Sequence, residues 1–377
     1  MTRNTRSFRS NLLVRLLVLV LLLVSGSIRA AESRFDDMVP ADITDFYWLR
    51  SYPELKRQIQ GSPYGELAEE EEVKAFVENL SGKLSEGFGE FKKATGAEPS
   101  QFEELFQGEV ALALRRDFSP GALGGRGGQA QKQPLQVWML LLVDVGGKAD
   151  RADEILEKTL AKAAEEGGLT VKEEEFRGHS LQHLIIKPAD VLSEKELRDM
   201  ARAGQAERAA AQQPTHLYVN LKDNILALSG GPDRSMLERH LVARDGGELE
   251  VLADSEFYQQ MQKHLEEGHI YSTFQNYQQM WDSLEGTGPV MPMLPFSVKQ
   301  LVDTLGLSSV QGQISGVTIG DEGISSHGML SAPAPRRGIL KAFEPEKHAT
   351  VRPPAFVGSD AALYGGLYFD VPTFWAE

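Results

Sequence analysis

The sequence predicts an α+β fold, with an antiparallel or mixed sheet of several hairpins and helices packed on it. Several pairs of strand-like segments are joined by short turns, and amphipathic helical segments lie between them. Strand and helix do not alternate strictly along the chain, as a Rossmann fold or an α/β barrel would require. The hairpins therefore favour the α+β class over both of these.

The first segment, residues 1–30, has the order of a secretory signal peptide. Arginines come first, then the uncharged apolar run 16–24, then small residues that include Ala30 and Ala31. A run of about nine residues is too short to cross a bilayer core, which needs about twenty. We expect cleavage after Ala30 and a periplasmic or extracellular protein. An uncleaved N-terminal anchor is the alternative.

The next elements are one strand and several helices. Residues 43–49 form a strand-like run, and residues 52–60 begin a helical pattern that Gly61-Ser62-Pro63 stops. Apolar residues three and four apart across 69–84 predict an amphipathic helix, and its acidic first turn suits the helix dipole. A short helix built on Phe102, Leu105 and Phe106 should end at Gly108.

Two apolar strands follow, separated by a segment of different character. Residues 110–114 have the composition of a buried strand. Residues 117–133 contain five glycines and several glutamines, so we expect a mobile loop. Residues 137–143 are apolar on both faces, which predicts a central strand covered on both sides. Residues 149–165 are predicted to form an amphipathic helix, closed by two glycines.

Two hairpins come next, with an insert between them. The first spans 169–187 and turns at Arg177-Gly178. The segment 193–213 is rich in Ala, Arg, Glu and Gln with little apolar periodicity, so it should be an exposed helical excursion or a partly disordered insert. The second hairpin spans 217–228 and turns at 222–224, where the residues tolerate positive φ.

The remaining elements complete a domain that we place at residues 31–345. They are helices at 233–242, 255–267 and 297–305, a strand at 270–274, and strands near 310–319 and 324–331 that turn at 320–323.

The last segment, residues 346–377, is expected to be a linker and the start of a truncated second similar unit. Residues 357–364 resemble 39–46, with Leu367 placed as Leu49 is. Coincidence is the alternative.

Composition argues against several functions. The net charge is −15, and removal of the five leader arginines leaves 34 basic against 54 acidic residues, hence −20. So acidic a surface repels phosphate backbones, and we expect no nucleic-acid partner. The chain has no cysteine, which excludes disulfides, a thiolate nucleophile and a lipid-modified N-terminal cysteine. No second apolar stretch approaches membrane-spanning length, so we expect no stable membrane span in the mature chain.

Short motifs along the chain carry a family resemblance. They are Val39-Pro40-Ala41-Asp42, Ser62-Pro63-Tyr64-Gly65, Leu105-Phe106-Gln107-Gly108-Glu109, the long strand ending at Asp144, and Leu305-Gly306-Leu307. With the leader, they resemble an uncharacterised family of exported bacterial proteins, the domain of unknown function thirty-three fifty-two. The resemblance covers most of residues 38–345 and implies export and an α+β fold. It implies no activity and carries over no functional residue. Members run on into a second similar half, where this chain stops.

The chain lacks residues that known catalytic and cofactor-binding motifs require. Residues 143–149 lie where a phosphate loop would, but they lack its first glycine and its metal-binding hydroxyl. His179 and His183 follow a strand pattern that places them over ten ångströms apart, at about 3.3 Å per residue, so we expect surface or edge histidines and no metal site. For His240 we expect an ordinary capping or surface role. Ser315 lies inside a strand rather than on a sharp elbow. We expect no cofactor.

One apolar segment is the candidate binding region. Met291, Met293 and Phe296 lie in a proline-stiffened loop, and methionines suit adaptable contact surfaces. Tyr277 and Trp281 come just before them. Together these residues could line a groove for an apolar ligand or a partner chain, with core packing as the alternative.

The sequence therefore favours an exported, soluble, non-enzymatic protein that binds or scaffolds something outside the cytoplasm. The partner would be an unknown protein or an apolar ligand, and the oligomeric state is left open. One alternative is an envelope or extracellular polymer hydrolase with an unrecognised carboxylate pair, although the acid runs 69–72 and 173–175 have the composition of solvated ends. Another alternative is a carrier of an apolar ligand.

Overall fold

The computed structural model describes residues 35–68, 70, 104–117, 136–165, 169–186, 214–265, 267–283, 297–320 and 323–343. Several predictions fall outside these ranges: the leader, the loop after Asp117, the insert 193–213, the linker 346–377 and all but residue 70 of the helix predicted at 69–84. In the described ranges, no helix has the length and apolar character needed to cross a bilayer.

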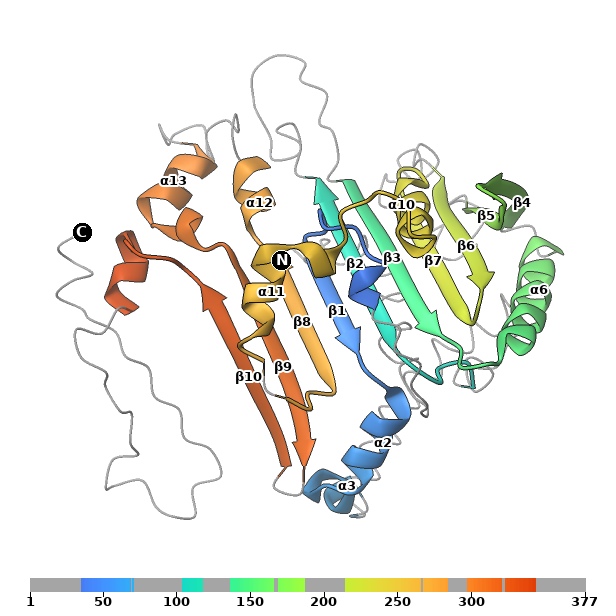
Figure 1. The fold of residues 1–377 in the computed structure, drawn as a ribbon, viewed down its shortest axis with the longest axis horizontal. Coiled ribbons are helices and arrows are strands. Elements are labelled where there is room, and N and C mark those ends of the chain that lie inside the picture. Colours follow the sequence, from blue (N-terminus) through green and yellow to red (C-terminus); the bar gives the residue numbers. More distant parts are fainter. Residues whose placement is uncertain are drawn as a thin grey trace, which may run out of the picture. The chain divides into compact units, whose positions relative to one another are not determined.

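Among the described residues, ten strands form one sheet in the order β10-β9-β8-β1-β2-β3-β7-β6-β5-β4 (Figure 1). The strands are β1 (Asp45–Leu49), β2 (Val110–Asp117), β3 (Gln136–Asp144), β4 (Leu169–Phe176), β5 (His179–Ile186), β6 (Thr215–Lys222), β7 (Ile225–Gly231), β8 (Tyr271–Asn276), β9 (Gly312–Gly320) and β10 (Gly323–Ser331). The ladders β1–β2, β3–β7, β4–β5, β5–β6 and β6–β7 are antiparallel, which confirms the antiparallel form of the predicted sheet.

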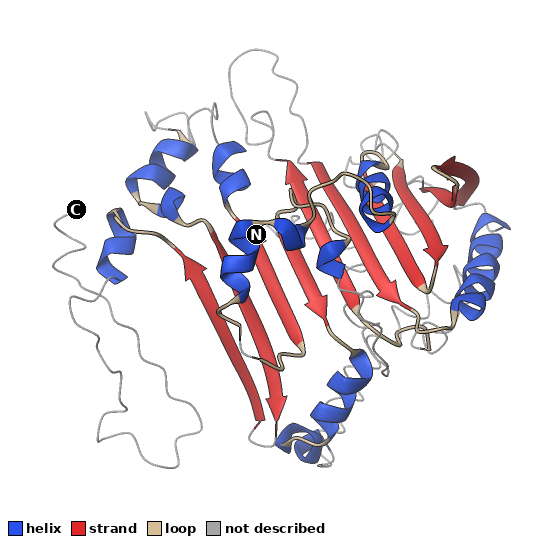
Figure 2. Ribbon diagram, in the orientation of Figure 1, coloured by secondary structure: helices blue, strands red, loops and turns tan. Residues whose placement is uncertain are grey.

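Helices occupy the connections between these strands (Figure 2). The described α-helices are α2 (Tyr52–Gln60), α3 (Pro63–Ala68), α6 (Ala149–Glu165), α10 (Ser235–Arg244), α11 (Glu256–Gln262), α12 (Gln278–Ser283) and α13 (Val298–Thr304). Short 3-10 turns are η1 (Phe35–Asp37), η2 (Leu252–Asp254), η3 (Leu307–Ser309) and η4 (Gly338–Phe343). The bounds predicted for α2 and α6 are confirmed, whereas α11 is shorter than predicted. Leu105 and Phe106 are buried beside a turn, so the helix predicted there is wrong in its described part.

Strand β3 is interior to the sheet, as its apolar run predicts. Met139, Leu141 and Val143 lie in a core cluster that also contains Ala152 and Ile155 of α6. The alternate side chains of β3 are buried as well, because strand residues point to opposite faces in turn. A strand buried on both faces must be apolar on both, and that requirement explains the sequence of β3.

The two predicted hairpins form with the predicted turns. Arg177 and Gly178 join β4 to β5 at φ values of 51° and 80°, and Asp223 and Asn224 join β6 to β7 at 47° and 66°. Two successive residues at positive φ match the right-handed twist of the strands they connect. The turn residues therefore set the register of both hairpins.

The chain divides into two compact units. The first contains residues 1–116, 137–274 and 314–328, and the second contains 117–136, 275–313 and 329–377. The first unit holds most of the strands together with α6 and α10. The second holds α12 and α13.

Candidate functional site

A row of polar side chains crosses one face of the first unit. In the antiparallel registers, His183 of β5 lies opposite Tyr218 of β6, and Tyr218 lies opposite Ser229 of β7. Residues directly opposite each other point to the same face, so the three side chains share it. The rings of His183 and Tyr218 stack with centroids 4.4 Å apart. Ser229 is fully buried, and its hydroxyl has no hydrogen-bond partner.

Glu174, His183 and His216 form a hydrogen-bonded chain that we call the histidine relay. Glu174 Oε1 lies 2.6 Å from His183 Nδ1, and His183 Nε2 lies 2.9 Å from His216 Nδ1. Burial tends to raise the pKa of Glu174, but hydrogen bonds from His183 and Arg234 outweigh it and lower the pKa. Burial, and then the charge of His183, lowers the pKa of His216. The arrangement favours an ionised glutamate and a neutral His216.

Arg234, just before α10, joins the relay to this helix. Its Nη1 lies 2.7 Å from Glu174 Oε2, and its Nε lies 2.7 Å from Glu238 Oε1. The second oxygen of Glu174 is therefore occupied by a guanidinium, while the first contacts His183. Charge-assisted contacts of this length hold α10 against the strand that carries Glu174.

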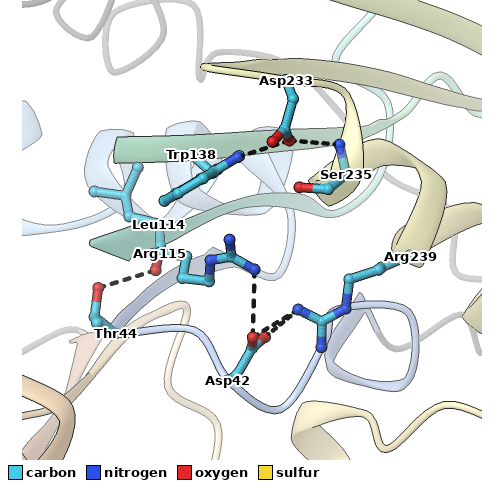
Figure 3. A network of polar contacts seen from close by, with 8 residues as sticks. All are labelled: Asp42, Thr44, Leu114, Arg115, Trp138, Asp233, Ser235 and Arg239. Carbon is cyan, nitrogen blue, oxygen red and sulfur yellow. Dashed lines mark hydrogen bonds and ion pairs between the residues drawn. The ribbon is translucent and has the colours of Figure 1, made fainter. Parts of the chain in front are cut away.

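A second set of polar contacts, the Asp42 cluster, lies around the same helix (Figure 3). Arg239 Nη1 of α10 lies 2.6 Å from both carboxylate oxygens of Asp42, and Arg115 Nη1 of β2 lies 3.4 Å from one of them. The Arg115 guanidinium stands 4.0 Å over the Trp138 ring, within the range of a cation–π contact. Asp42 thus joins the segment before β1 to β2 and α10.

Trp138 extends the Asp42 cluster to the start of α10. Its indole Nε1 donates to Asp233 Oδ1 at 3.0 Å, and the backbone amide of Ser235 donates to the same oxygen at 2.9 Å (Figure 3). Burial tends to raise the pKa of Asp233, but these hydrogen bonds outweigh it and lower the pKa. An ionised carboxylate at the first turn also suits the helix dipole.

The histidines predicted at the surface are buried, so that prediction is wrong. His179 and His183 are 2% and 8% exposed, and His240 is fully buried. Nε2 of His179 lies 2.7 Å from Asp245, and Nδ1 of His240 lies 3.0 Å from the Met38 carbonyl oxygen. Each of these histidines has a hydrogen-bond partner distant in sequence. These hydrogen bonds offset the cost of burying the polar rings. The strand predicted for His179 and His183 is confirmed, because both lie in β5.

Glu109 is a separate, half-buried acid just before β2. Burial raises its pKa to about 7, against the opposing effect of hydrogen bonds from the Trp48 side chain and the Phe35 backbone. The charges of Asp36 and Asp144 raise it further. Glu109 Oε2 has no hydrogen-bond partner. This group can therefore hold a proton near neutral pH.

Of the predicted binding residues, Tyr277 and Trp281 lie in the second unit. Met291, Met293 and Phe296 are outside the described residues. Tyr277 and Trp281 come together, with ring centroids 6.3 Å apart.

Both rings of this pair have their polar atoms engaged. Trp281 Nε1 donates to the Val310 carbonyl oxygen at 2.6 Å, and the Tyr277 hydroxyl donates to Gln275 at 2.8 Å. These contacts fix two half-buried rings inside the second unit. The predicted apolar groove stays a prediction.

The two edges of the sheet differ in charge. Edge strand β4 carries Lys172, Glu173, Glu174 and Glu175, the kind of charged edge that resists pairing with another chain. Strand β10, at the other edge, reads Gly-Ile-Ser-Ser-His-Gly-Met-Leu-Ser and has no Lys, Arg, Asp, Glu or Pro. Residues 324–328 are all exposed. Among the described strands, β10 is therefore an uncharged, accessible edge.

The direction of the β10 amides follows from one contact. The amide of Gln311, just before β9, donates to the Ser331 carbonyl oxygen at 2.8 Å, so the Ser331 backbone faces β9. Successive residues of a strand direct their backbone groups to alternate sides. The amides and carbonyls of Ile324, Ser326, Gly328 and Leu330 therefore face away from β9. Among the described residues no strand pairs with this side of β10, which we call the open edge.

Comparison with known proteins gives no identification: no protein-family model, curated protein or solved structure matches the chain. Within the described ranges, no group of three or more His, Asp or Glu side chains is placed to hold a metal ion.

Proposed function

We propose that this chain is an exported, non-enzymatic binding or scaffolding protein that pairs an extended segment of its partner with the open edge of β10. The observation that carries the proposal is the contrast between the two edges. Charges occupy β4, whereas β10 exposes a nine-residue strand without charge or proline. Addition of a strand to such an edge gives affinity through main-chain hydrogen bonds and specificity through alternate side chains.

Apolar side chains near one end of β10 support a binding role. Ile324 of β10 is 49% exposed, and Tyr64 and Leu67 of α3 are 47% and 46% exposed. A Cβ placed on Gly323 would lie 3.5 Å from the Tyr64 ring, so α3 reaches the start of β10. Exposed apolar groups beside an open edge would contact alternate side chains of an added strand.

The polar face supports a structural role for the charged residues. In the Asp42 cluster and the histidine relay, the carboxylates already contact arginine or histidine partners. We propose that these contacts hold α10 on one face of the sheet while α6 lies on the other. The sheet would then present β10 from a rigid support.

Export and family membership are parts of the same proposal. The leader at residues 1–30 supports release outside the cytoplasm, and the quoted motifs support membership in the exported family named above. A strand-binding scaffold agrees with the lack of any catalytic signature in these motifs.

Site-specific photo-crosslinking in the exporting cell tests the proposal. A photoreactive residue is placed at Ser326 in the open edge and, as the matched control, at Glu173 in the charged edge. We expect an adduct from position 326 and none from position 173. The proposal is overturned if position 326 gives no adduct or if both positions give the same adducts.

A second candidate, a hydrolase of envelope or extracellular polymers, is favoured by one observation. Glu109 has a pKa raised to about 7 by burial, and the nearby charges of Asp36 and Asp144 contribute to that shift. A protonated acid near other carboxyl groups is an arrangement that glycoside hydrolysis uses. The Glu109→Gln variant should abolish hydrolysis of a polysaccharide panel if this function is correct. No hydrolysis by the unmodified protein would reject it.

A further inference from the structure

We infer that α10 is an acid-released cover: protonation of the buried His240 detaches this helix from the sheet face beneath it while the sheet itself stays folded. Helix α10 contacts β7, and both belong to the first unit (Figure 1). Met236, Leu237 and Leu241 of the helix are fully buried. A helix of ten residues is marginal in water by itself, so its packing on the sheet keeps α10 in place.

Buried polar atoms without a hydrogen-bond partner gather on α10 and on the sheet face beneath it. Asn220 follows Tyr218 by two residues in β6, so its side chain lies on the same face. His179 precedes His183 by four residues in β5 and lies on that face too. Among the described residues, the unpaired atoms here are Ser235 Oγ, His240 Nε2 and Arg244 Nη1 on the helix and His179 Nδ1, Asn220 Oδ1 and Ser229 Oγ on the sheet. Each costs free energy while the helix covers the face, and each can bond to water once the face is uncovered.

His240 is poorly placed to take a proton while α10 is closed. Its ring is fully buried, and Nδ1 lies 3.0 Å from the Met38 carbonyl oxygen. A carbonyl oxygen only accepts, so Nδ1 carries the hydrogen and the neutral ring keeps a lone pair on Nε2. A proton added to Nε2 would meet no acceptor among the described residues. Arg244, one turn further along the same helix face, would stand beside the new charge.

The groups around His240 decide the direction of the pH effect. Burial lowers the pKa of His240 most, to about 4, and the hydrogen bond to Met38 opposes this shift. The charges of Arg244 on α10 and His179 on β5 lower the pKa further, whereas Asp245 raises it. In the released helix the ring regains its ordinary pKa of 6.5. Release therefore takes up a proton as the pH falls from about 6.5 to about 4, and acid favours the released helix.

Both ends of α10 are tied to the β4–β5 hairpin by contacts that acid also weakens. Just before the helix, Arg234 Nη1 lies 2.7 Å from Glu174 Oε2. Just after it, Asp245 Oδ2 lies 2.7 Å from His179 Nε2. The hydrogen bond from His179 lowers the pKa of Asp245, and the pKa of Glu174 is lowered despite its burial. A lowered carboxyl pKa means that stability is lost as the pH falls toward it, so these contacts act in the same direction as His240.

Thiol labelling measures the release, because the chain has no cysteine of its own. Ser229→Cys places a thiol of similar size on β7 at a fully buried position. Val219→Cys places one on the other face of the sheet, in the core cluster that includes residues of α6. The exposed Ser180→Cys is the reference. Each full mature chain is labelled with a pyridyl disulfide reagent from pH 7 to pH 4.5. Each rate is divided by the reference rate at the same pH, which removes the pH dependence of the thiol chemistry.

We expect the relative labelling rate of Ser229→Cys to rise at least about tenfold from pH 7 to pH 4.5, because release takes up the proton that the closed His240 does not bind. At pH 4.5 this rate should exceed that of Val219→Cys at least about tenfold, because only the local opening exposes position 229. Adding His240→Asn, which keeps an amide donor for Met38 but cannot titrate, should reduce the rise to less than about threefold. A rate that does not rise, equal rates at positions 229 and 219, or a rise that His240→Asn leaves unchanged overturns the inference.

A second substitution, at an exposed position, keeps the test decisive if His240→Asn does not fold, which circular dichroism checks. Asp245→Asn removes the charge-assisted contact with His179 at the end of α10. We expect it to raise the relative labelling rate of Ser229→Cys at pH 6 at least about threefold. The matched control is Glu248→Gln, which changes an exposed acid three residues later and should leave the rate within about 1.5-fold. Equal rates in the two variants contradict the release of α10 as its end contacts are lost.

Discussion

Arg239 Nη1 lies 2.6 Å from both carboxylate oxygens of Asp42, so this contact joins α10 to a residue 197 positions earlier in the sequence. It fixes the segment before β1 to the helix that begins just after Arg234. The two side chains are only 28% and 41% exposed, so the contact is partly shielded from water. Because water screens the two charges less, this pair should stabilise the fold more than a typical surface ion pair does.

Replacement of Arg239 by alanine should therefore destabilise the fold. We expect the free energy of unfolding in urea to fall by about 1 kcal/mol, because Asp42 loses its double contact. The matched control is Arg151→Ala, which removes an ion pair with Glu154 at a more exposed position on α6. That change should lower the unfolding free energy less than Arg239→Ala does, because the pair is screened by water. Equal losses in the two variants would show that the Asp42 contact has no special weight.

His240 should make stability depend on pH below neutrality. Burial lowers its pKa from 6.5 to about 4, so the folded chain favours the neutral ring more than the unfolded chain does. The unfolded state therefore binds the proton first, and stability is lost as pH falls from about 6.5 to about 4. His240→Gln removes this titration. The unfolding free energy of the wild type should drop by about 3 kcal/mol more than that of the variant over this range. Parallel pH curves would contradict the assignment.

Glu109 should have the opposite effect at higher pH. Burial raises its pKa from 4.5 to about 7, so the folded chain favours the protonated acid. Stability from this group is fully present below about 4.5 and is lost as pH rises toward about 7. We compare the change in unfolding free energy that Glu109→Gln causes at pH 8 with the change that it causes at pH 4.5. The change at pH 8 should be more stabilising by about 2 to 3 kcal/mol. The exposed Glu173→Gln serves as the control and should show no such difference; a Glu109→Gln effect that is the same at both pH values argues against the burial explanation.

The interior position of β3 predicts a large cost for truncation. Leu140 is fully buried, and Leu140→Ala should lower the unfolding free energy by about 2 to 5 kcal/mol through lost burial and a new cavity. Leu67→Ala in α3, where the side chain is 46% exposed, should cost less than about 1 kcal/mol. Chemical denaturation of both variants measures the difference. Similar losses would mean that β3 is not the core strand described.

Local sequence predicted the elements that local contacts build. The two hairpins form where turn residues accept positive φ, and β3 is interior because its residues are apolar on both faces. The position of β8 beside β1 was not predictable in this way, because these strands are more than 200 residues apart and no local pattern specifies their pairing.

The partners of the buried histidines in the candidate site could not be predicted from local sequence either. The partner of His183 in the relay, His216, is 33 positions away, and the partner of His240 is 202 positions away. One available signal was that His179, Leu181, His183 and Ile185 alternate along β5. Because alternate residues share a face, the two apolar residues indicate that the histidines lie on a buried face.

The central claim is that the open edge of β10 binds a partner strand. Amide hydrogen exchange at single-residue resolution tests this claim most directly. The protein is measured as a dilute purified chain and again in its native extracytoplasmic extract. We predict that the outward amides of Ile324, Ser326, Gly328 and Leu330 exchange fast in the dilute chain and slowly in the extract, while the amides that face β9 exchange slowly in both. Outward amides that exchange equally fast in both samples would contradict the claim that this edge binds a partner strand.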